Sequence, residues 1–227
     1  MSNLFAIIPA RSGSVGVPDK NIASIGGVPL LVRAYRVARS LPLNVHVIVS
    51  TDSPHYLTLL KPEGYKDTVL RSTELSSSGS LVIDTILHEL ARAGASNNDL
   101  VTLLEPSFVG RRRANLKMAI DRVSNGEADS CFGVYQVPTA FHYNKQYVHD
   151  GNLLQPVGQQ ANVNRQELQP AYVRSGEFYL SRVGQVRADR SLFGGRLAMF
   201  ETAPPFVNID NVEDMQRAAR IADDISE

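Results

Sequence analysis

A loop of small residues between two cations follows the first apolar run of the chain. Residues 4–8 are typical of a buried parallel strand. Small residues let a backbone approach a polyanion closely, and their successive N–H groups can point inward as a nest for an anion. Arg11 and Lys20 bracket this nest, so the pattern predicts a phosphate-binding loop after the first strand. The loop contains Arg11, Ser12, Gly13, Ser14, Gly16, Pro18, Lys20 and Asn21.

The loop matches neither of two common phosphate-binding motifs. Only Gly13 and Gly16 are present, and no helix is predicted directly after them, which excludes the dinucleotide fingerprint G-x-G-x-x-G. No Gly-Lys-Ser or Gly-Lys-Thr follows, which excludes a Walker loop. An ordinary polar turn after an edge strand is the alternative interpretation of the loop residues taken alone.

The elements that must position this loop alternate between strands and helices. Such alternation favours an α/β fold with a mostly parallel sheet covered on both faces. Ligands of these sheets lie beyond the carboxyl ends of the strands, and Arg11, Arg71 and Glu105 each follow such an end. Apolar patterns predict strands at 4–8, 45–50, 69–71, 100–104, 129–134, 177–181 and 198–200, and helices at 29–41, 81–93, 114–123 and 212–225, with a further helix starting after an N-cap sequence at 51–54.

An insertion interrupts the alternation at residues 139–169. Short apolar pairs at 147–148 and 153–154 flank the turn sequence His-Asp-Gly-Asn, which predicts a hairpin, and the polar stretch 159–167 predicts a loop. The insertion is too poor in apolar residues to form its own core, so we expect it to be a lid or a dimerisation arm on one domain that spans 1–227. Its large apolar side chains are Phe141, Tyr143, Tyr147, Leu153 and Leu154.

The composition sets limits on partners and location. The 227 residues include 43% hydrophobic and 20% charged residues, which is ordinary for a globular protein. Lys plus Arg and Asp plus Glu both number 23, so a broad basic face for nucleic acid is not expected. No apolar run approaches the ~18 residues of a membrane span, and the first residues lack a basic signal-peptide region. The single cysteine, Cys131, lies in an apolar stretch and predicts packing only, so we expect a cytoplasmic protein without a membrane partner.

The loop and the residues after it resemble the N-terminal signature of the cytidylyltransferases that activate sialic acid and related nonulosonic acids. That signature reads P-A-R-x-G-S-K-G-x-P-x-K-N and continues with G-G-x-P-L-I. Val15 stands where the family has a lysine. The matching residues are Pro9, Ala10, Arg11, Gly13, Ser14, Gly16, Pro18, Lys20, Asn21, Gly26, Gly27, Pro29 and Leu30.

Further segments extend the resemblance over most of the chain. Residues 49–53 match V-S-T-D-S, residues 71–75 resemble R-P-x-E-L, and residues 84–88 fit D-x-x-L-H. Residues 165–172 resemble R-Q-x-x-x-P-x-Y, and Tyr179 matches the end of the following G-x-x-Y. The resemblance implies that the first arginine of 71–75 lies at the nucleotide. It also implies that the arginine of 165–172 faces the carboxylate of the sugar acid, which a guanidinium can grip with two hydrogen bonds.

The C-terminal segment 208–214 resembles the metal-binding sequence D-I-D-T-x-x-D. Asp210 and Asp214 match, whereas Asn208 replaces the first aspartate. The resemblance implies that Asp210 holds Mg²⁺, a hard cation that favours carboxylate oxygens. The alternative is that Asp210 only caps the last helix.

Other departures fall in the half of the chain that would hold the nucleotide. Glu105 replaces the glutamine of Q-P-T-S-P-L-R, and an ionised carboxylate cannot donate the hydrogen bonds of an amide. Leu81 and Val82 replace paired serines. Two alternatives to the family activity therefore stay open. One is a degenerate member that binds nucleotide poorly or serves as an assembly subunit, and the other is a nucleotidyltransferase with a different base or acceptor.

The resemblance as a whole implies a Rossmann-like nucleotidyltransferase fold, a homodimer, and the transfer of CMP from CTP to a nonulosonic acid with Mg²⁺, releasing pyrophosphate. Such a reaction depends on orientation and on neutralising developing negative charge. The implied roles are catalysis by Lys20 and Arg11 at the phosphates, a phosphate cradle at Arg11, Gly13 and Ser14, nucleotide contacts by Asn21 and Arg71, acceptor contacts by Arg165, Gln166 and Tyr179, and metal binding by Asp210.

Overall fold

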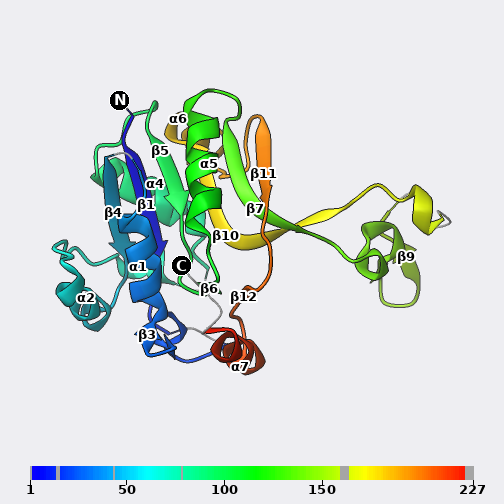
Figure 1. Cartoon of the computed structure of the whole chain (residues 1–227), viewed down its shortest axis with the longest axis horizontal. Coiled ribbons are helices and arrows are strands. Elements are labelled where there is room, and N and C mark those ends of the chain that lie inside the picture. Colours follow the sequence, from blue (N-terminus) through cyan, green and yellow to red (C-terminus); the bar gives the residue numbers. More distant parts are fainter. Residues whose placement is uncertain (1, 14–15, 43, 78, 159–163, 223–227) are drawn as a thin grey trace.

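A six-stranded sheet forms the centre of the computed structural model (Figure 1). In sheet order the strands are β11 (Leu197–Glu201), β7 (Ser130–Gln136), β10 (Tyr172–Arg182), β5 (Leu100–Leu103), β1 (Leu4–Pro9) and β4 (Val45–Ser50). The β1–β4, β1–β5 and β11–β7 pairs are parallel, and only β10 runs against its neighbours. The predicted mostly parallel sheet is therefore confirmed. The structure describes residues 2–13, 16–42, 44–77, 79–158 and 164–222.

The orientation of β10 follows from the connection that precedes it. Parallel neighbours need a crossover, usually a helix, whereas the chain between β7 and β10 runs out through the insertion and returns without crossing the sheet. The prediction covered only residues 177–181 of this strand. Its first half carries polar and exposed residues, which hide it from a search for apolar runs.

Helices cover both faces of the sheet because its strands are apolar on both sides. In β1, Leu4, Ala6 and Ile8 join one core, while Phe5 and Ile7 point to the other. The first core is closed by α1 (Leu30–Arg39), α2 (Pro54–Leu60) and α5 (Arg113–Ser124), and the second by α4 (Val82–Arg92) and α6 (Val183–Asp189).

A third, smaller core joins distant parts of the chain below the sheet. The short strand β6 (Phe108–Val109) pairs with β12 (Val207–Asn208), and α7 (Val212–Arg220) packs beside the hairpin formed by β2 (Ser24–Ile25) and β3 (Val28–Pro29). This packing brings the segment after β12 to the loop that follows β1.

Several sequence predictions need correction. Residues 69–71 are not a strand; the backbone N–H of Arg71 instead donates a single hydrogen bond to the Thr51 carbonyl at 2.8 Å. The last helix ends at Arg220 rather than at 225, and residues 223–227 lie outside the described part of the chain. Short elements with few apolar positions were missed, namely α3 (Thr73–Ser76), α6 and the 3₁₀ turns η1 (Lys20–Ile22) and η2 (Lys61–Glu63). The N-cap at Ser53 and the buried Cys131 are as predicted.

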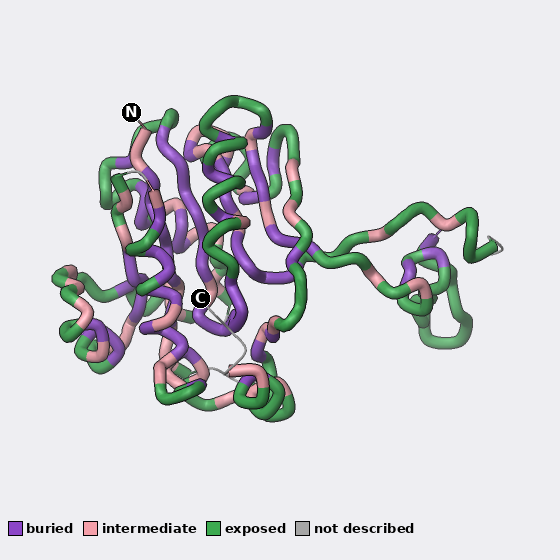
Figure 2. Tube along the Cα trace, viewed as in Figure 1, coloured by how far each residue is buried: buried purple, intermediate pink, exposed green. Residues whose placement is uncertain are grey.

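The insertion projects from the ends of β7 and β10 and is largely exposed (Figure 2). Its predicted hairpin is present as β8 (Tyr147–His149) and β9 (Leu154–Pro156). Single 3₁₀ turns, η3 (Thr139–Phe141), η4 (Tyr143–Lys145) and η5 (Arg165–Glu167), accompany it where no helical period was seen. The predicted loop at 159–167 lies partly outside the described residues. Within the described chain, no helix has the length and hydropathy needed to cross a membrane.

Candidate active site

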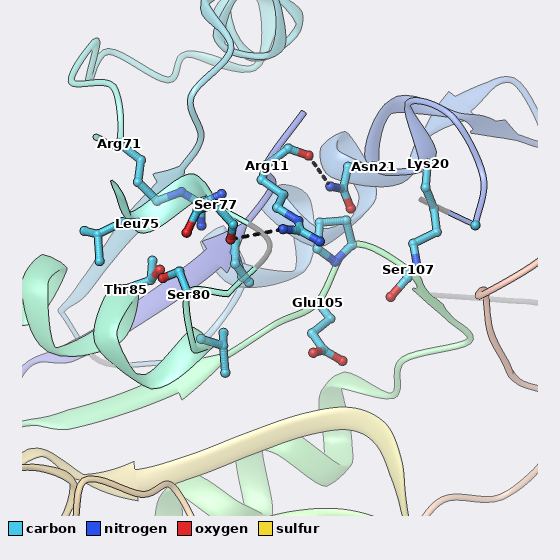
Figure 3. A pocket seen from close by; sticks show the side chains of 14 residues that line it. Arg11, Lys20, Asn21, Arg71, Leu75, Ser77, Ser80, Thr85, Glu105 and Ser107 are labelled. Carbon is cyan, nitrogen blue, oxygen red and sulfur yellow. Dashed lines mark hydrogen bonds between the residues drawn. The ribbon is translucent and has the colours of Figure 1, made fainter. Parts of the chain in front are cut away.

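A polar cavity of about 290 Å³ opens at the carboxyl ends of β1 and β5 (Figure 3). Three cationic side chains reach it from separate segments: Arg11 from the loop after β1, Lys20 from η1, and Arg71 from the chain after α2. The uncharged and acidic side chains of the polar wall are Asn21, Ser77, Ser80, Thr85, Glu105 and Ser107. The strand-end position predicted for the ligand is therefore where the cavity lies.

The loop after β1 is fixed from below by Asp52. The backbone N–H and the hydroxyl of Ser12 donate hydrogen bonds to the two carboxylate oxygens of Asp52 at 2.7 and 2.8 Å. Burial disfavours the charged form of Asp52, but these hydrogen bonds outweigh it and hold the pKa below its usual value. Gly13 follows in the left-handed region at φ 71° and is exposed, but it is not among the residues that line the cavity. Ser14 and Val15 lie outside the described residues.

The far side of the loop packs against the segment after β12. A Cβ on Gly16 would lie 2.4 Å from the Asp210 carbonyl oxygen, so only glycine permits this approach. Lys20 Nζ donates to the Ile209 carbonyl at 2.7 Å and pairs with Asp210 Oδ1 at 3.1 Å. Lys20 and the predicted metal-binding residue are thus side by side.

Asn21 and Arg11 are linked to each other. The buried Asn21 donates from Nδ2 to the Arg11 carbonyl at 3.0 Å, which fixes the backbone from which the Arg11 side chain extends (Figure 3). Arg11 Nη1 in turn donates to the Ser77 carbonyl at 3.3 Å. Asn21 therefore positions Arg11 as well as lining the cavity.

Arg71 is the most buried cation in the cavity wall. Its side chain is 8% exposed, and Nε donates to Ser76 Oγ at 3.2 Å, while its buried Nη2 has no hydrogen-bond partner among the described atoms. Burial lowers the pKa of Arg71, although the Asp52 carboxylate opposes this shift. Because Nη2 itself is closed off from solvent, a ligand in the cavity would meet the rest of the Arg71 guanidinium, which is suited to an anionic or carbonyl group.

A second cavity, of about 540 Å³, adjoins the first and has a more apolar wall. Leu81, Val82 and Phe193 line it together with Arg174 and Tyr179 of β10. The Arg174 guanidinium lies 4.4 Å from the centre of the Phe193 ring, in cation–π contact. Arg174 and Tyr179 flank the point where the β10–β7 ladder shifts register, and the shift directs both side chains to this cavity.

Glu105 and Val82 line both cavities. Burial raises the pKa of Glu105, while Arg111, Lys20 and Arg174 oppose the shift. The buried Arg111 donates to the backbone carbonyls of Glu105 and Glu177, so it ties the loop after β5 to β10. These contacts fix the boundary between the two cavities.

The structure brings together most of the predicted site, but not all of it. Arg11, Lys20, Asn21 and Arg71 meet at the first cavity, Tyr179 lines the second, and Asp210 lies at the rim beside Lys20. Arg165 and Gln166 are exposed on the insertion and line neither cavity of their own chain.

The cation–π pair of the second cavity, Arg174 and Phe193, was not predicted. Arg174 lies between Tyr172 and Gly176, two positions that match the family sequence, so the sequence could have indicated it as a site residue. Phe193 follows α6, a helix that was not predicted, so no sequence pattern indicated Phe193 as a site residue.

The oxygen ligands that Asp210 and Asn208 offer at the rim of the first cavity fit a metal ion only if a bound nucleotide supplies further ligands. Within the described part of the chain, no three His, Cys, Asp or Glu side chains are grouped to hold a metal. Asp210 offers one exposed carboxylate, and the Asn208 amide oxygen accepts a hydrogen bond from Ser107 Oγ at 3.1 Å. Mg²⁺ at nucleotide sites usually takes one or two carboxylates plus phosphate oxygens and water, so Asp210 fits as one ligand.

Known proteins are similar to this chain in sequence. Residues 5–108 match the sequence model of the cytidylyltransferases. An N-acylneuraminate cytidylyltransferase of Streptococcus agalactiae serotype V is 27% identical over 92% of this chain and 50% of its own length. A CMP-N,N'-diacetyllegionaminic acid synthase of Legionella pneumophila is 26% identical over 84% of this chain and 82% of its own. The chain is therefore similar to cytidylyltransferases, by the family model over residues 5–108 and by these two relatives along most of its length.

A solved structure shares the fold of this chain. The solved structure of a CMP:2-keto-3-deoxy-manno-octonic acid synthetase complexed with CTP superposes with a TM-score of 0.74 at 17% identity, covering 99% of this chain and all of that one. This likeness establishes the Rossmann-like nucleotidyltransferase fold. The match to the cytidylyltransferase model covers every named residue of the first cavity but ends before Arg174, Tyr179 and Phe193. The chain also spans only half the length of the S. agalactiae relative.

Proposed function

We propose that this chain transfers CMP from CTP to a nonulosonic, sialic-like acid and releases pyrophosphate. The observation that carries the proposal is the pair of adjoining cavities, one cationic and one partly apolar, with Glu105 and Val82 in the wall of both. A group transfer needs two ligands held side by side with the reacting atoms in line, and two adjoining cavities of different character suit a nucleotide and an acceptor.

The first cavity would hold the nucleotide. Arg11 and Lys20 face the triphosphate and neutralise the charge that develops as pyrophosphate leaves. The Arg71 guanidinium would contact the nucleotide at the other end of the cavity, and Asn21 would keep Arg11 in place. The acceptor hydroxyl attacks the α-phosphorus, and the bond from that phosphorus to the bridging oxygen of pyrophosphate breaks.

The second cavity would hold the acceptor. Arg174 supplies a cation for the carboxylate of a sugar acid, and Tyr179 and Phe193 offer faces for the ring and its substituents. The names of the relatives from S. agalactiae and L. pneumophila support acceptors of the N-acylneuraminic and legionaminic classes.

A homodimer would complete the acceptor site. The insertion exposes Phe141, Tyr147 and Leu153 at 66%, 53% and 65%, and such a surface is suited to burial against a second copy of the chain. Docked in this way, the insertion would present Arg165 and Gln166 to the neighbouring site. A cytoplasmic location stays a prediction from the sequence.

A magnesium ion bound with CTP would be held by Asp210. When bound, the ion neutralises phosphate charge and polarises the phosphoryl group. Lys20 would then exchange its contact with Asp210 for the phosphates, while its hydrogen bond to the Ile209 carbonyl keeps it at the loop.

A nucleotidyltransferase with a different base or acceptor is the second candidate. Leu81 and Val82 expose 65% and 45% of their surface at the cavities, where the related enzymes of the sequence signature carry serines. Apolar side chains cannot hydrogen-bond to a base edge, so selection for cytosine would rest on other groups.

Thermal unfolding with each of the four ribonucleoside triphosphates, with and without Mg²⁺, separates these functions. A ligand at 100 times its Kd stabilises by about 2.7 kcal/mol, or roughly 5–11 °C for a chain of this size. We expect this shift with CTP alone. A shift with another triphosphate would indicate the second candidate, and no shift with any of them would indicate a degenerate member. Product formation from CTP and each sugar acid then identifies the acceptor.

A further inference from the structure

Glu105 has the position that a proton acceptor for the transfer would need. It follows β5 in the loop that separates the two cavities, and it lines both of them. In Figure 3 its side chain projects away from Arg11, towards the side on which β10 lies. The acceptor hydroxyl and the α-phosphorus must meet at this boundary if one ligand occupies each cavity.

The Glu105 carboxylate is also free to act. Among the described residues, no hydrogen bond or ion pair engages its carboxylate oxygens, although its backbone carbonyl accepts from Arg111 Nη2 at 2.8 Å. The other nearby carboxylates are engaged, because Asp52 accepts from Ser12 and Asp210 pairs with Lys20. Within the described residues, Glu105 is the only carboxylate that lines either cavity.

The surroundings make this carboxyl group a stronger base than an exposed glutamate. Burial raises its pKa, and the Asp210 carboxylate adds to the shift. The cations Arg111, Lys20 and Arg174 limit the rise. The pKa of the neighbouring Tyr179 is raised by burial and by the charge of Glu105, which keeps the phenol protonated. A general base works best when its pKa approaches the working pH.

We propose that Glu105 is the general base that takes the proton of the attacking acceptor hydroxyl. This inference rests on the proposed cytidylyl transfer. The hydroxyl oxygen forms a bond to the α-phosphorus as its proton passes to a Glu105 carboxylate oxygen, and pyrophosphate departs with the electron pair of the broken bond. The proton then leaves Glu105 for solvent when the products are released. Glu105 is therefore a catalytic residue, and its replacement of the family's glutamine is functional.

The variant Glu105→Gln tests this role because it keeps the shape of the side chain and removes its basicity. We expect turnover to fall by about 10²–10⁴-fold, with CTP binding measured by calorimetry unchanged within about twofold. The limb of the parent pH profile that falls at low pH, where Glu105 is protonated, should disappear. Formate should partly rescue Glu105→Ala, because a small carboxylate can enter the space of the missing side chain. Glu127→Gln, an exposed change in the turn after α5, is the matched control.

Stability gives a readout that does not depend on activity. Because the folded-state pKa of Glu105 is raised, the folded chain loses stability as the pH rises through the window between the unfolded and folded pKa values. Glu105→Gln should therefore be at least as stable as the parent at pH 7, and its advantage should vanish at low pH.

Three results would overturn the assignment. Turnover of Glu105→Gln equal to that of the parent or higher would mean that the site prefers the amide. Loss of CTP binding in this variant would make Glu105 a binding residue only, and a variant less stable at pH 7 would show that cations hold the carboxylate ionised. A parent chain that forms no product with any sugar acid would instead overturn the proposed function, and the base with it.

Discussion

Replacing Lys20 by methionine removes one charge at the phosphate loop while keeping an unbranched side chain of similar length. Lys20 is 19% exposed, and its ammonium group donates to the Ile209 carbonyl at 2.7 Å and to Asp210 Oδ1 at 3.1 Å. The change therefore removes a cation from the first cavity and also two contacts that hold the loop to the segment after β12. Activity and stability should both respond, by amounts that can be separated.

The structure sets the size of both effects. Removing one preorganised donor of charge stabilisation costs about 10²–10³ in turnover. Loss of a hydrogen bond from a charged group to a buried carbonyl costs about 1.5–3 kcal/mol, whereas the pair with Asp210, which is 72% exposed, adds ~0–1 kcal/mol. A loss of about 2 kcal/mol corresponds to a fall in Tm of roughly 4–8 °C for a chain of this size.

The assay is steady-state release of pyrophosphate from CTP with a sugar acid, run beside thermal unfolding of the same samples. Lys117→Met, an exposed change on α5, is the matched control and should alter neither quantity. Lys20→Arg should keep the stability but not the full turnover, because the guanidinium is larger than the ammonium group. If Lys20→Met has normal turnover and a lower Tm, Lys20 does not stabilise the transition state and its role is structural only.

Four further predictions follow from other parts of the structure. Gly16→Ala would place a Cβ 2.4 Å from the Asp210 carbonyl oxygen, so it should destabilise the chain by about 1–3 kcal/mol in chemical unfolding, and an unchanged midpoint would contradict this packing. Asn208→Asp should lower the Mg²⁺ concentration for half-maximal CMP transfer, and an equal or higher requirement would remove this position from the metal site. Phe141→Asp on the insertion should give a monomer at micromolar concentration in sedimentation, where the parent is a dimer, and a parent that is itself monomeric would refute the arm. Mixing Lys20→Met with Arg165→Ala chains should restore roughly a quarter of the parent activity if each site uses both copies, and no recovery would contradict a shared site.

Sequence patterns predicted the parts of the fold that are built from local repeats. The strand before the loop and helices such as α1 and α4 repeat apolar residues at one period over enough positions to be recognised. The helix α6 escaped because it has only seven residues and two buried valines. The antiparallel orientation of β10 depends on the path of the inserted segment, which no local period records.

The site could be predicted where residues close in sequence act together. Arg11 and Asn21 are ten residues apart, and their signature was legible in one stretch. The pairing of Lys20 with Asp210 joins positions 190 residues apart, and only the third core brings them together. The backbone of Arg71 is held by one hydrogen bond to the Thr51 carbonyl and not by the strand that was predicted. The position of Glu105 between two cavities depends on the tertiary structure, so the sequence could not predict the role proposed for it.

The place of β10 in the sheet constrains the order in which this chain can fold. β10 is inserted between β5 and β7 and joins the β5-β1-β4 half of the sheet to the β7-β11 half. During synthesis the strands β1, β4 and β5 emerge first, and the fully buried β5 has an open edge until residue 182 has left the ribosome. An apolar edge exposed in this way is prone to pair with other chains. We therefore expect that the segment 5–108, which matches the cytidylyltransferase model, does not fold on its own, and that a chain truncated before β10 depends on chaperones or aggregates.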